Sequence, residues 1–138
     1  MSAKFKYKVP CRKDKLCEIR TFVSEVLAKY DISEVEVNKL VLAVDEVCAN
    51  LMIHSHQCNP KEQLELFILI DKDKSVIFEI TDKGLGFNLA EYKEPSLQEV
   101  IQKKKKGGIG LMLVRRIMDD IQFESKRNQN TCRLFKKL

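Results

Sequence analysis

The sequence has no tryptophan, few glycines and prolines, and no long run of apolar residues. With Gly 5 and Pro 3 in 138 residues, it cannot be a collagen-like or proline-rich low-complexity chain. Its most apolar stretch, residues 64–70, contains Glu65 and is far shorter than the roughly 18 residues that a membrane-spanning helix needs. The N-terminus alternates lysine with bulky residues and lacks the apolar core of a signal peptide. We therefore expect no membrane segment and no secretory signal.

Cysteine is present, but in a pattern that indicates neither a disulfide framework nor a metal site. The chain has Cys 5, an odd number, and no two cysteines have the C-x-x-C spacing. This pattern is typical of reduced thiols in a cytoplasmic protein. Two histidines and a cysteine at a spacing of two, His54, His56 and Cys58, could be read as zinc ligands. No fourth ligand is evident nearby, so we do not expect a zinc site.

Size and charge indicate a single folded domain with its basic residues concentrated in one half. The 44% hydrophobic and 33% charged residues exclude a disordered chain, and 138 residues correspond to one domain, residues 1–138. The net charge of +5 lies entirely in the second half, which holds four consecutive lysines, Lys103, Lys104, Lys105 and Lys106. Aromatic residues are only 7%, so a general nucleic-acid binder is not expected. A local anion site or an acidic protein partner fits better, and charge alone leaves both open.

Hydrophobic periodicity predicts the element order β-α-α-β-β-loop-α-β-β. Period-two alternation or β-rich composition marks strands at residues 4–9, 64–71, 75–82, 121–125 and 131–135. Helical spacing predicts a first helix from residue 15 and a third helix at residues 111–119. Between them, a long helix begins at the capping box Ser33-x-x-Glu36 and ends at about His54. We expect an α+β fold, a two-layer α/β sandwich whose mixed, mostly antiparallel sheet is covered by helices on one face.

Three polar residues form a stripe along the long helix. Glu46, Asn50 and His54 are spaced i, i+4 and i+8, so they follow one another along the same side and border the apolar face. The stripe can be the exposed edge of an amphipathic helix. It can also be a functional wall, because an amide oxygen suits Mg²⁺ and a carboxylate one turn earlier can deprotonate a water or hydroxyl.

Two glycine-containing segments are the other candidates for chemistry. Asp82-x-Gly84-x-Gly86 follows a predicted strand and, taken alone, is compatible with a simple tight turn. Gly108-x-Gly110 precedes the third helix, where it can be a flexible helix start or a place where backbone amides approach a phosphate.

Together, these three segments, in this order and at these separations, resemble the GHKL ATPases, which have the Bergerat-type ATP-binding fold. The resemblance extends over residues 1–137. The small size, the strand ahead of the first helix and the pattern Asp45-Glu46-x-x-x-Asn50-x-x-x-His54 are most similar to the bacterial anti-sigma-factor serine/threonine kinases. The resemblance implies binding of ATP and Mg²⁺, with Asn50 coordinating the metal at the phosphates. It also implies that Glu46 is the general base or orients the attacking hydroxyl, and that Asp82 accepts a hydrogen bond from the adenine amino group.

The resemblance further implies roles for the glycines and for one threonine. Gly84 and Gly86 would let the backbone pass close to the base, Gly108 and Gly110 would place amides against the phosphates, and residues 88–108 would be the ATP lid. The family usually has Gly-Thr before the last strand, whereas this chain has Asn130-Thr131. Asparagine tolerates the left-handed conformation, so Thr131 can still face the nucleotide pocket. The family assigns no role to His54 and does not require the four lysines.

The resemblance gives one leading function and two alternatives. The leading function is a cytoplasmic kinase that phosphorylates a serine or threonine of a STAS-type anti-sigma-factor antagonist and sequesters a sigma factor, with a homodimer as the family's common state. One alternative is a nucleotide-gated binding module without phosphotransfer, and the presence of Glu46 favours the kinase over it. The other, a histidine-kinase catalytic domain, is disfavoured because the chain has no phosphoacceptor helix hairpin.

Overall fold

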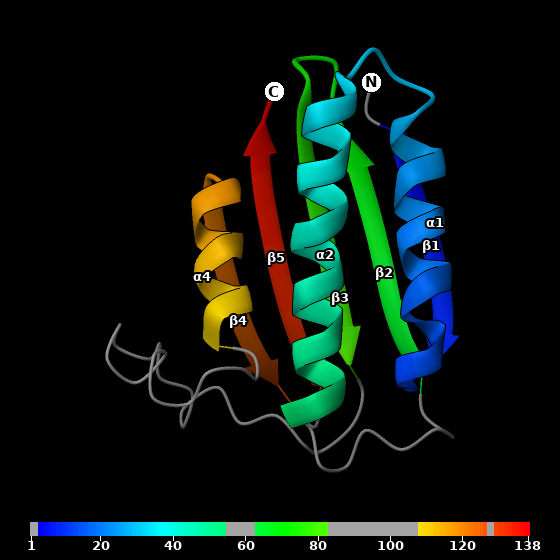
Figure 1. The fold of residues 1–138 in the computed structure, drawn as a ribbon, viewed down its shortest axis with the longest axis vertical. Coiled ribbons are helices and arrows are strands. Elements are labelled where there is room, and N and C mark those ends of the chain that lie inside the picture. Colours follow the sequence, from blue (N-terminus) through cyan, green and yellow to red (C-terminus); the bar gives the residue numbers. More distant parts are fainter. Residues whose placement is uncertain (1–2, 55–62, 83–107, 127–128) are drawn as a thin grey trace.

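Five strands form one sheet, and three helices lie against one of its faces in the described part of the chain (Figure 1). This computed structural model describes residues 3–54, 63–82, 108–126 and 129–138. The strands are β1 (Ala3–Pro10), β2 (Gln63–Ile70), β3 (Ser75–Asp82), β4 (Asp120–Lys126) and β5 (Gln129–Lys137). The helices are α1 (Leu16–Leu27), α2 (Glu34–His54) and α4 (Gly108–Ile117). A short 3-10 helix, η1 (Lys13–Lys15), precedes α1.

The sheet has the order β1-β2-β3-β5-β4. All four pairs of neighbouring strands are antiparallel. The described strands therefore form a purely antiparallel sheet, whereas we expected a mixed, mostly antiparallel one. The predicted α+β class and the order of elements are confirmed. The short helix that the sequence predicts around residues 97–102 and most of the predicted lid lie outside the described residues.

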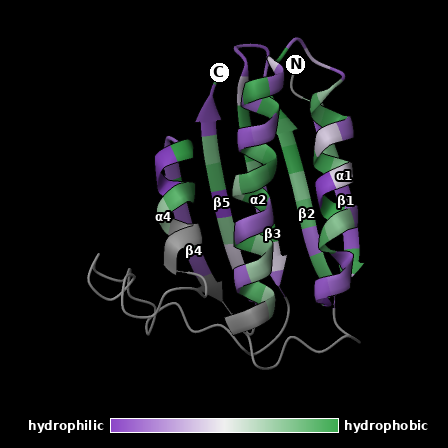
Figure 2. Ribbon diagram, in the orientation of Figure 1, coloured by the Kyte–Doolittle hydropathy of each residue, from purple (hydrophilic) through white to green (hydrophobic). Residues whose placement is uncertain are grey.

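The core lies between the sheet and the helices. On β2 and β3 every second side chain faces the helices, and these side chains are almost completely buried, among them Leu66, Ile68, Phe78 and Ile80. Figure 2 shows that β2 is largely hydrophobic, whereas the turn that joins it to β3 is hydrophilic. At the edge of the sheet, the Tyr7 ring of β1 stacks on the Phe22 ring of α1 with centroids 4.8 Å apart.

Helix α2 begins where the sequence predicts. The Ser33 hydroxyl oxygen accepts a hydrogen bond from the Glu36 amide at 3.2 Å, which satisfies one of the free amides of the first turn. The helix then runs unbroken to His54. Because its start and length are set locally, Glu46 and Asn50 fall in its second half, beside the ends of the central strands.

The expectation of reduced thiols is wrong at one position. Cys11, which is buried, is bonded in a disulfide, whereas the described cysteines Cys17, Cys48 and Cys132 are free. Sequence spacing missed this bond because it depends on which cysteines the fold brings together. Within the described ranges, no helix is long and apolar enough to cross a lipid bilayer.

Candidate functional site

The predicted site residues that the structure describes lie at one end of the molecule. The second half of α2, the C-terminal end of β3 and the first residues of α4 all lie at the lower end of Figure 1. The three segments are far apart in the sequence, and the antiparallel hairpin of β2 and β3 together with the contact of α2 with α4 brings them to the same end.

Asn50 presents a buried oxygen acceptor at this end. Its side chain is only 6% exposed, and its Nδ2 donates a hydrogen bond to the backbone oxygen of Glu46 at 2.7 Å. This bond fixes the amide orientation and leaves Oδ1 buried without a hydrogen-bond partner among the described residues. An unsatisfied buried acceptor costs about 1–3 kcal/mol. A hard oxygen held in this way fits Mg²⁺, which uses few protein ligands and prefers oxygen.

Glu46 lies one helical turn before Asn50 and is half-buried. Burial raises the pKa of its carboxyl above the ordinary value for glutamate, and the negative charge of the neighbouring Asp45 raises it further. Both effects disfavour the ionised form. A carboxylate with a raised pKa is a stronger base than an exposed one, which suits a group that accepts a hydroxyl proton.

Asp82 is completely buried at the last position of β3. Its Cα is paired with Leu64 on one side and Asn130 on the other. Because side chains alternate along a strand, Asp82 shares the helix-facing side with the core residue Ile80. A carboxylate placed there is a strong acceptor for an amino group in a water-poor environment.

The start of α4 offers backbone donors to the same end. Gly108 and Gly110 are its first and third residues, and no acidic side chain occupies the first turn. The first amides of a helix have no partner within the helix and carry its partial positive charge, so they attract anions. Gly108 and Gly110 themselves have no side chain that could stand between these amides and a ligand.

Thr131 lies at the same end of the sheet as Asp82 but on the other face. Its hydroxyl lies 3.3 Å from that of Thr81, and the two residues are paired across β3 and β5. Since Thr81 precedes Asp82 on β3, the two threonines lie on the sheet face opposite to Asp82 and to α2. This placement does not support the expected contact of Thr131 with the nucleotide.

Several predicted residues lie outside the described part of the chain. These are Gly84, Gly86, His56, Cys58, Lys103, Lys104, Lys105 and Lys106. The side chain of His54 is not described either, although the residue ends α2. Among the described residues, no cluster of three or more His, Cys, Asp or Glu could hold a metal ion, so the metal site is proposed from Asn50 and the phosphates of the ligand.

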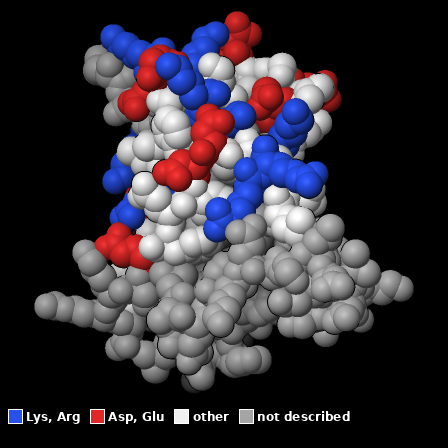
Figure 3. Space-filling view, turned by 90° about the vertical axis from the view of Figure 1, so that its left-hand side faces the viewer, with Lys and Arg blue, Asp and Glu red and all other residues white. Residues whose placement is uncertain are grey.

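One relevant contact is invisible in the sequence. Arg20 of α1 donates a hydrogen bond through Nη1 to Oδ1 of Asp45 on α2 at 2.9 Å, directly before Glu46. No local signal relates two residues 25 positions apart on different helices. Figure 3 shows a different surface, the side formed by α4 and β4, where acidic and basic side chains are interspersed rather than gathered by sign.

Comparison with known proteins gives a family and several relatives. Residues 9–136 match the family described as histidine kinase-like ATPase domain. The chain is 27% identical over 123 residues to serine-protein kinase RsbW of Oceanobacillus iheyensis, an alignment that covers 86% of this chain and 77% of the relative. It is 28% identical over 119 residues to anti-sigma F factor of Clostridium perfringens, covering 86% of this chain and 84% of the relative.

Solved structures share the fold. The RsbU and RsbW domains of a Mycobacterium tuberculosis protein superpose with a TM-score of 0.72 at 14% identity, covering 99% of this chain but only 32% of that one. The SiaB–SiaC complex of Pseudomonas aeruginosa superposes with a TM-score of 0.68 at 12% identity, covering 95% of this chain and 88% of that one. At these identities the superpositions show the fold alone.

Proposed function

Because the chain belongs to the family of histidine kinase-like ATPase domains, we propose that it is an ATP-dependent serine/threonine protein kinase of the anti-sigma-factor type. The observation that carries the proposal is the pair on α2. Asn50 presents an orphan oxygen that fits Mg²⁺, and Glu46, one turn away, has the raised pKa of a base. A purely structural helix edge needs neither feature.

In this proposal each residue has one task. Asn50 Oδ1 coordinates Mg²⁺ at the phosphates, Asp82 accepts a hydrogen bond from the adenine amino group, and the amides at the start of α4 contact phosphate oxygens. Bound ATP·Mg²⁺ supplies the phosphoryl group and neutralises charge. Glu46 takes the proton of the attacking hydroxyl as the bond from that oxygen to the γ-phosphorus forms and the bond to the β,γ-bridging oxygen breaks, which leaves ADP and a phosphoester.

The partners are proposed from the relatives. Serine-protein kinase RsbW and anti-sigma F factor are the names of similar proteins. The names support a serine kinase and an opponent of a sigma factor. From the resemblance of the sequence to anti-sigma-factor kinases, we further propose that the chain phosphorylates a STAS-type anti-sigma-factor antagonist, sequesters a sigma factor and forms a homodimer. The proposal also keeps the roles that the resemblance implies for residues 88–108, as the ATP lid, and for Gly84 and Gly86, beside the adenine; of these residues the structure describes only Gly108.

A second candidate is a binding module that holds its partner when nucleotide is bound but transfers no phosphate. The observation in its favour is that one relative is named anti-sigma F factor, a name that mentions a sigma factor and no kinase activity. The two candidates differ in the need for Glu46, since a binding module requires Asn50 and Asp82 but no base.

Radiolabel transfer from ATP to purified antagonist candidates tests the proposal. We expect the wild type to label a serine or threonine, and Glu46→Gln to lower the rate by about 10²–10⁴ while nucleotide affinity stays near the wild-type value. The matched control is Glu25→Gln, which changes an exposed glutamate of α1 and should leave the rate unchanged. A wild type that binds ATP but labels no partner would support the binding module instead.

A further inference from the structure

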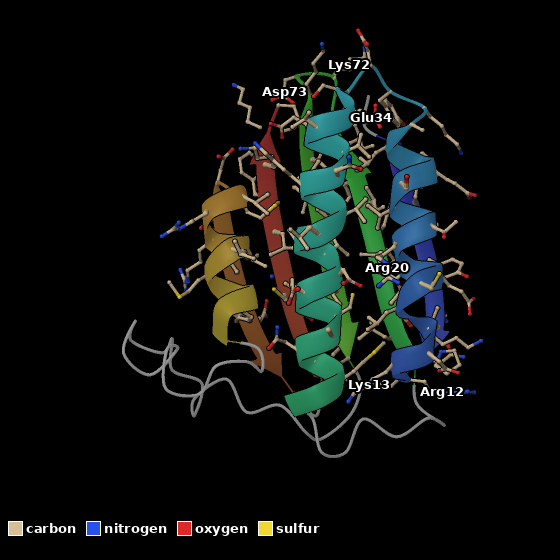
Figure 4. All side chains as sticks on the ribbon, in the orientation of Figure 1. Arg12, Lys13, Arg20, Glu34, Lys72 and Asp73 are labelled. Carbon is tan, nitrogen blue, oxygen red and sulfur yellow. The ribbon has the colours of Figure 1, made fainter. Side chains whose placement is uncertain are left out.

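A cavity lies at the end of the sheet opposite to the proposed nucleotide site. It has a volume of about 350 Å³ and is formed by the start of β1, the loop between α1 and α2, and the turn that joins β2 to β3. Figure 4 shows Lys72 and Asp73 of that turn at the same end as Glu34, the first residue of α2, and far from Arg12 and Lys13. The proposed kinase chemistry does not use this end of the molecule.

The walls of the cavity are mostly apolar and its rim is charged. Tyr30, Ile32, Ile70 and Leu138 provide the apolar part. The charged residues that line it are two acidic and two basic ones, Asp31, Asp71, Lys72 and Lys74. A volume of a few hundred Å³ with apolar walls and a few polar groups is typical of sites for small organic molecules.

The four charged side chains are available to a ligand. All four residues are exposed, and none of their side chains makes an ion pair or hydrogen bond to another described residue. Two positive and two negative groups stand at one rim, so a purely anionic or purely cationic ligand would meet groups of its own sign. A small molecule that carries one charge of each sign matches the rim best.

Lys74 has a backbone conformation that lysine does not favour. Its φ is 66°, the one positive φ of a described residue other than glycine. Its amide donates to the Asp71 oxygen and its own oxygen accepts from the Leu138 amide, both at 3.0 Å, so the turn holds this conformation. Glycine or asparagine would occupy the position with less strain. A lysine that lines the cavity therefore stands at a position where its backbone conformation carries some cost.

We propose that this cavity binds a free α-amino acid with an apolar side chain. The side chain fills the space between Tyr30, Ile32 and Ile70. The carboxylate of the ligand pairs with Lys74 at the rim, and its ammonium group pairs with Asp31. Asp31 and Lys74 also line an adjoining cavity of about 320 Å³, so the charged head of the ligand lies where the two cavities meet.

Titration of the full chain with L-leucine and L-phenylalanine, followed by calorimetry and amide NMR shifts, tests the proposal. We expect a Kd of about 1 mM or tighter, with shifts at Tyr30, Ile32 and Lys74. Leucinol lacks the carboxylate, N-acetyl-leucine lacks the ammonium group and glycine lacks the side chain, so each should bind at least about tenfold more weakly. No saturable binding of either amino acid, or equal binding of the analogues, overturns the proposal.

Two variants separate loss of the site from loss of the fold. Lys74→Gly removes the ammonium group and relieves the backbone strain, so the melting temperature should stay level or rise while leucine affinity falls about tenfold or more. Asp31→Asn should weaken leucine in the same way. The matched control is Lys39→Ala, which removes an exposed lysine of α2 outside the cavity and should change nothing. Unchanged leucine affinity in Lys74→Gly and Asp31→Asn also overturns the proposal.

Discussion

Arg20 of α1 and Asp45 of α2 form an ion pair with a separation of 2.9 Å between Nη1 and Oδ1. Figure 4 shows Arg20 on the stretch of α1 that lies beside α2. Asp45 immediately precedes Glu46 and raises the pKa of its carboxyl. The pair therefore joins two helices of the layer and partly offsets a charge that acts on the proposed catalytic base.

The first prediction concerns the strength of this pair. The Arg20 side chain is 45% exposed and that of Asp45 is 19% exposed, so solvent screens the interaction. We expect a double-mutant cycle with Arg20→Ala and Asp45→Asn, measured by urea unfolding, to give a coupling free energy of about 0.2–1 kcal/mol. The coupling should shrink in high salt. A coupling that salt leaves unchanged would contradict the view that the pair is solvent-screened.

The second prediction concerns the pH dependence of phosphotransfer. Glu46 accepts a proton only when ionised, and its pKa is raised, so the rate should fall on acidification at a higher pH than for an ordinary glutamate. Asp45→Asn removes a negative neighbour and should move this acid limb to lower pH, whereas Arg20→Ala leaves Asp45 uncompensated and should move it to higher pH. Rate profiles of the three proteins test the signs, and shifts in the opposite directions would refute them.

The raised pKa of Glu46 also has a consequence for stability. A carboxyl that binds its proton more tightly in the folded than in the unfolded state favours folding when protonated. The free energy of unfolding therefore loses this contribution as the pH rises from the ordinary glutamate pKa through the raised folded-state pKa. Urea unfolding across this pH range should show a smaller loss for Glu46→Gln than for the wild type, and equal losses would contradict the assignment.

The third prediction concerns Asn50. Asn50→Ala removes the orphan acceptor and should abolish Mg²⁺-dependent nucleotide binding in calorimetry. The fold should survive, because the deleted oxygen has no hydrogen-bond partner among the described residues and the Nδ2 bond goes to a backbone oxygen of the same helix. Asn38→Ala, at an exposed asparagine of α2, is the matched control. A large fall in melting temperature without ligand would indicate a structural role for Asn50.

The fourth prediction concerns the preference for adenine over guanine in the bound nucleotide. Asp82 is fully buried, so its carboxylate can discriminate strongly between an amino group and a carbonyl. Asp82→Asn should weaken ATP binding by about 1–3 kcal/mol, with little effect on the already weak binding of GTP. Calorimetry with both nucleotides measures the difference. Equal affinity of the wild type for ATP and GTP would remove Asp82 from this role.

Local patterns were sufficient for the order of the elements and for part of the site. The capping serine and the hydrophobic period of α2 act over a few residues, so the helix bounds could be predicted from them. The spacing of Glu46 and Asn50 likewise puts both on one side of any helix that contains them. What the spacing could not decide was whether that side is buried, because burial depends on the layers packed around it.

Features that depend on contacts between distant segments were decided only by the tertiary structure. Thr131 belongs to a strand that the sequence predicts, yet its face is set by the register of β5 against β3, and a shift of one residue would reverse it. The pairing of Arg20 with Asp45, the disulfide at Cys11 and the cavity that Tyr30 lines have the same origin. The sequence alone determines which helix or strand each segment can form. The packing of the segments determines which side chains come into contact, because these contacts join residues that are far apart in the sequence and share no local pattern.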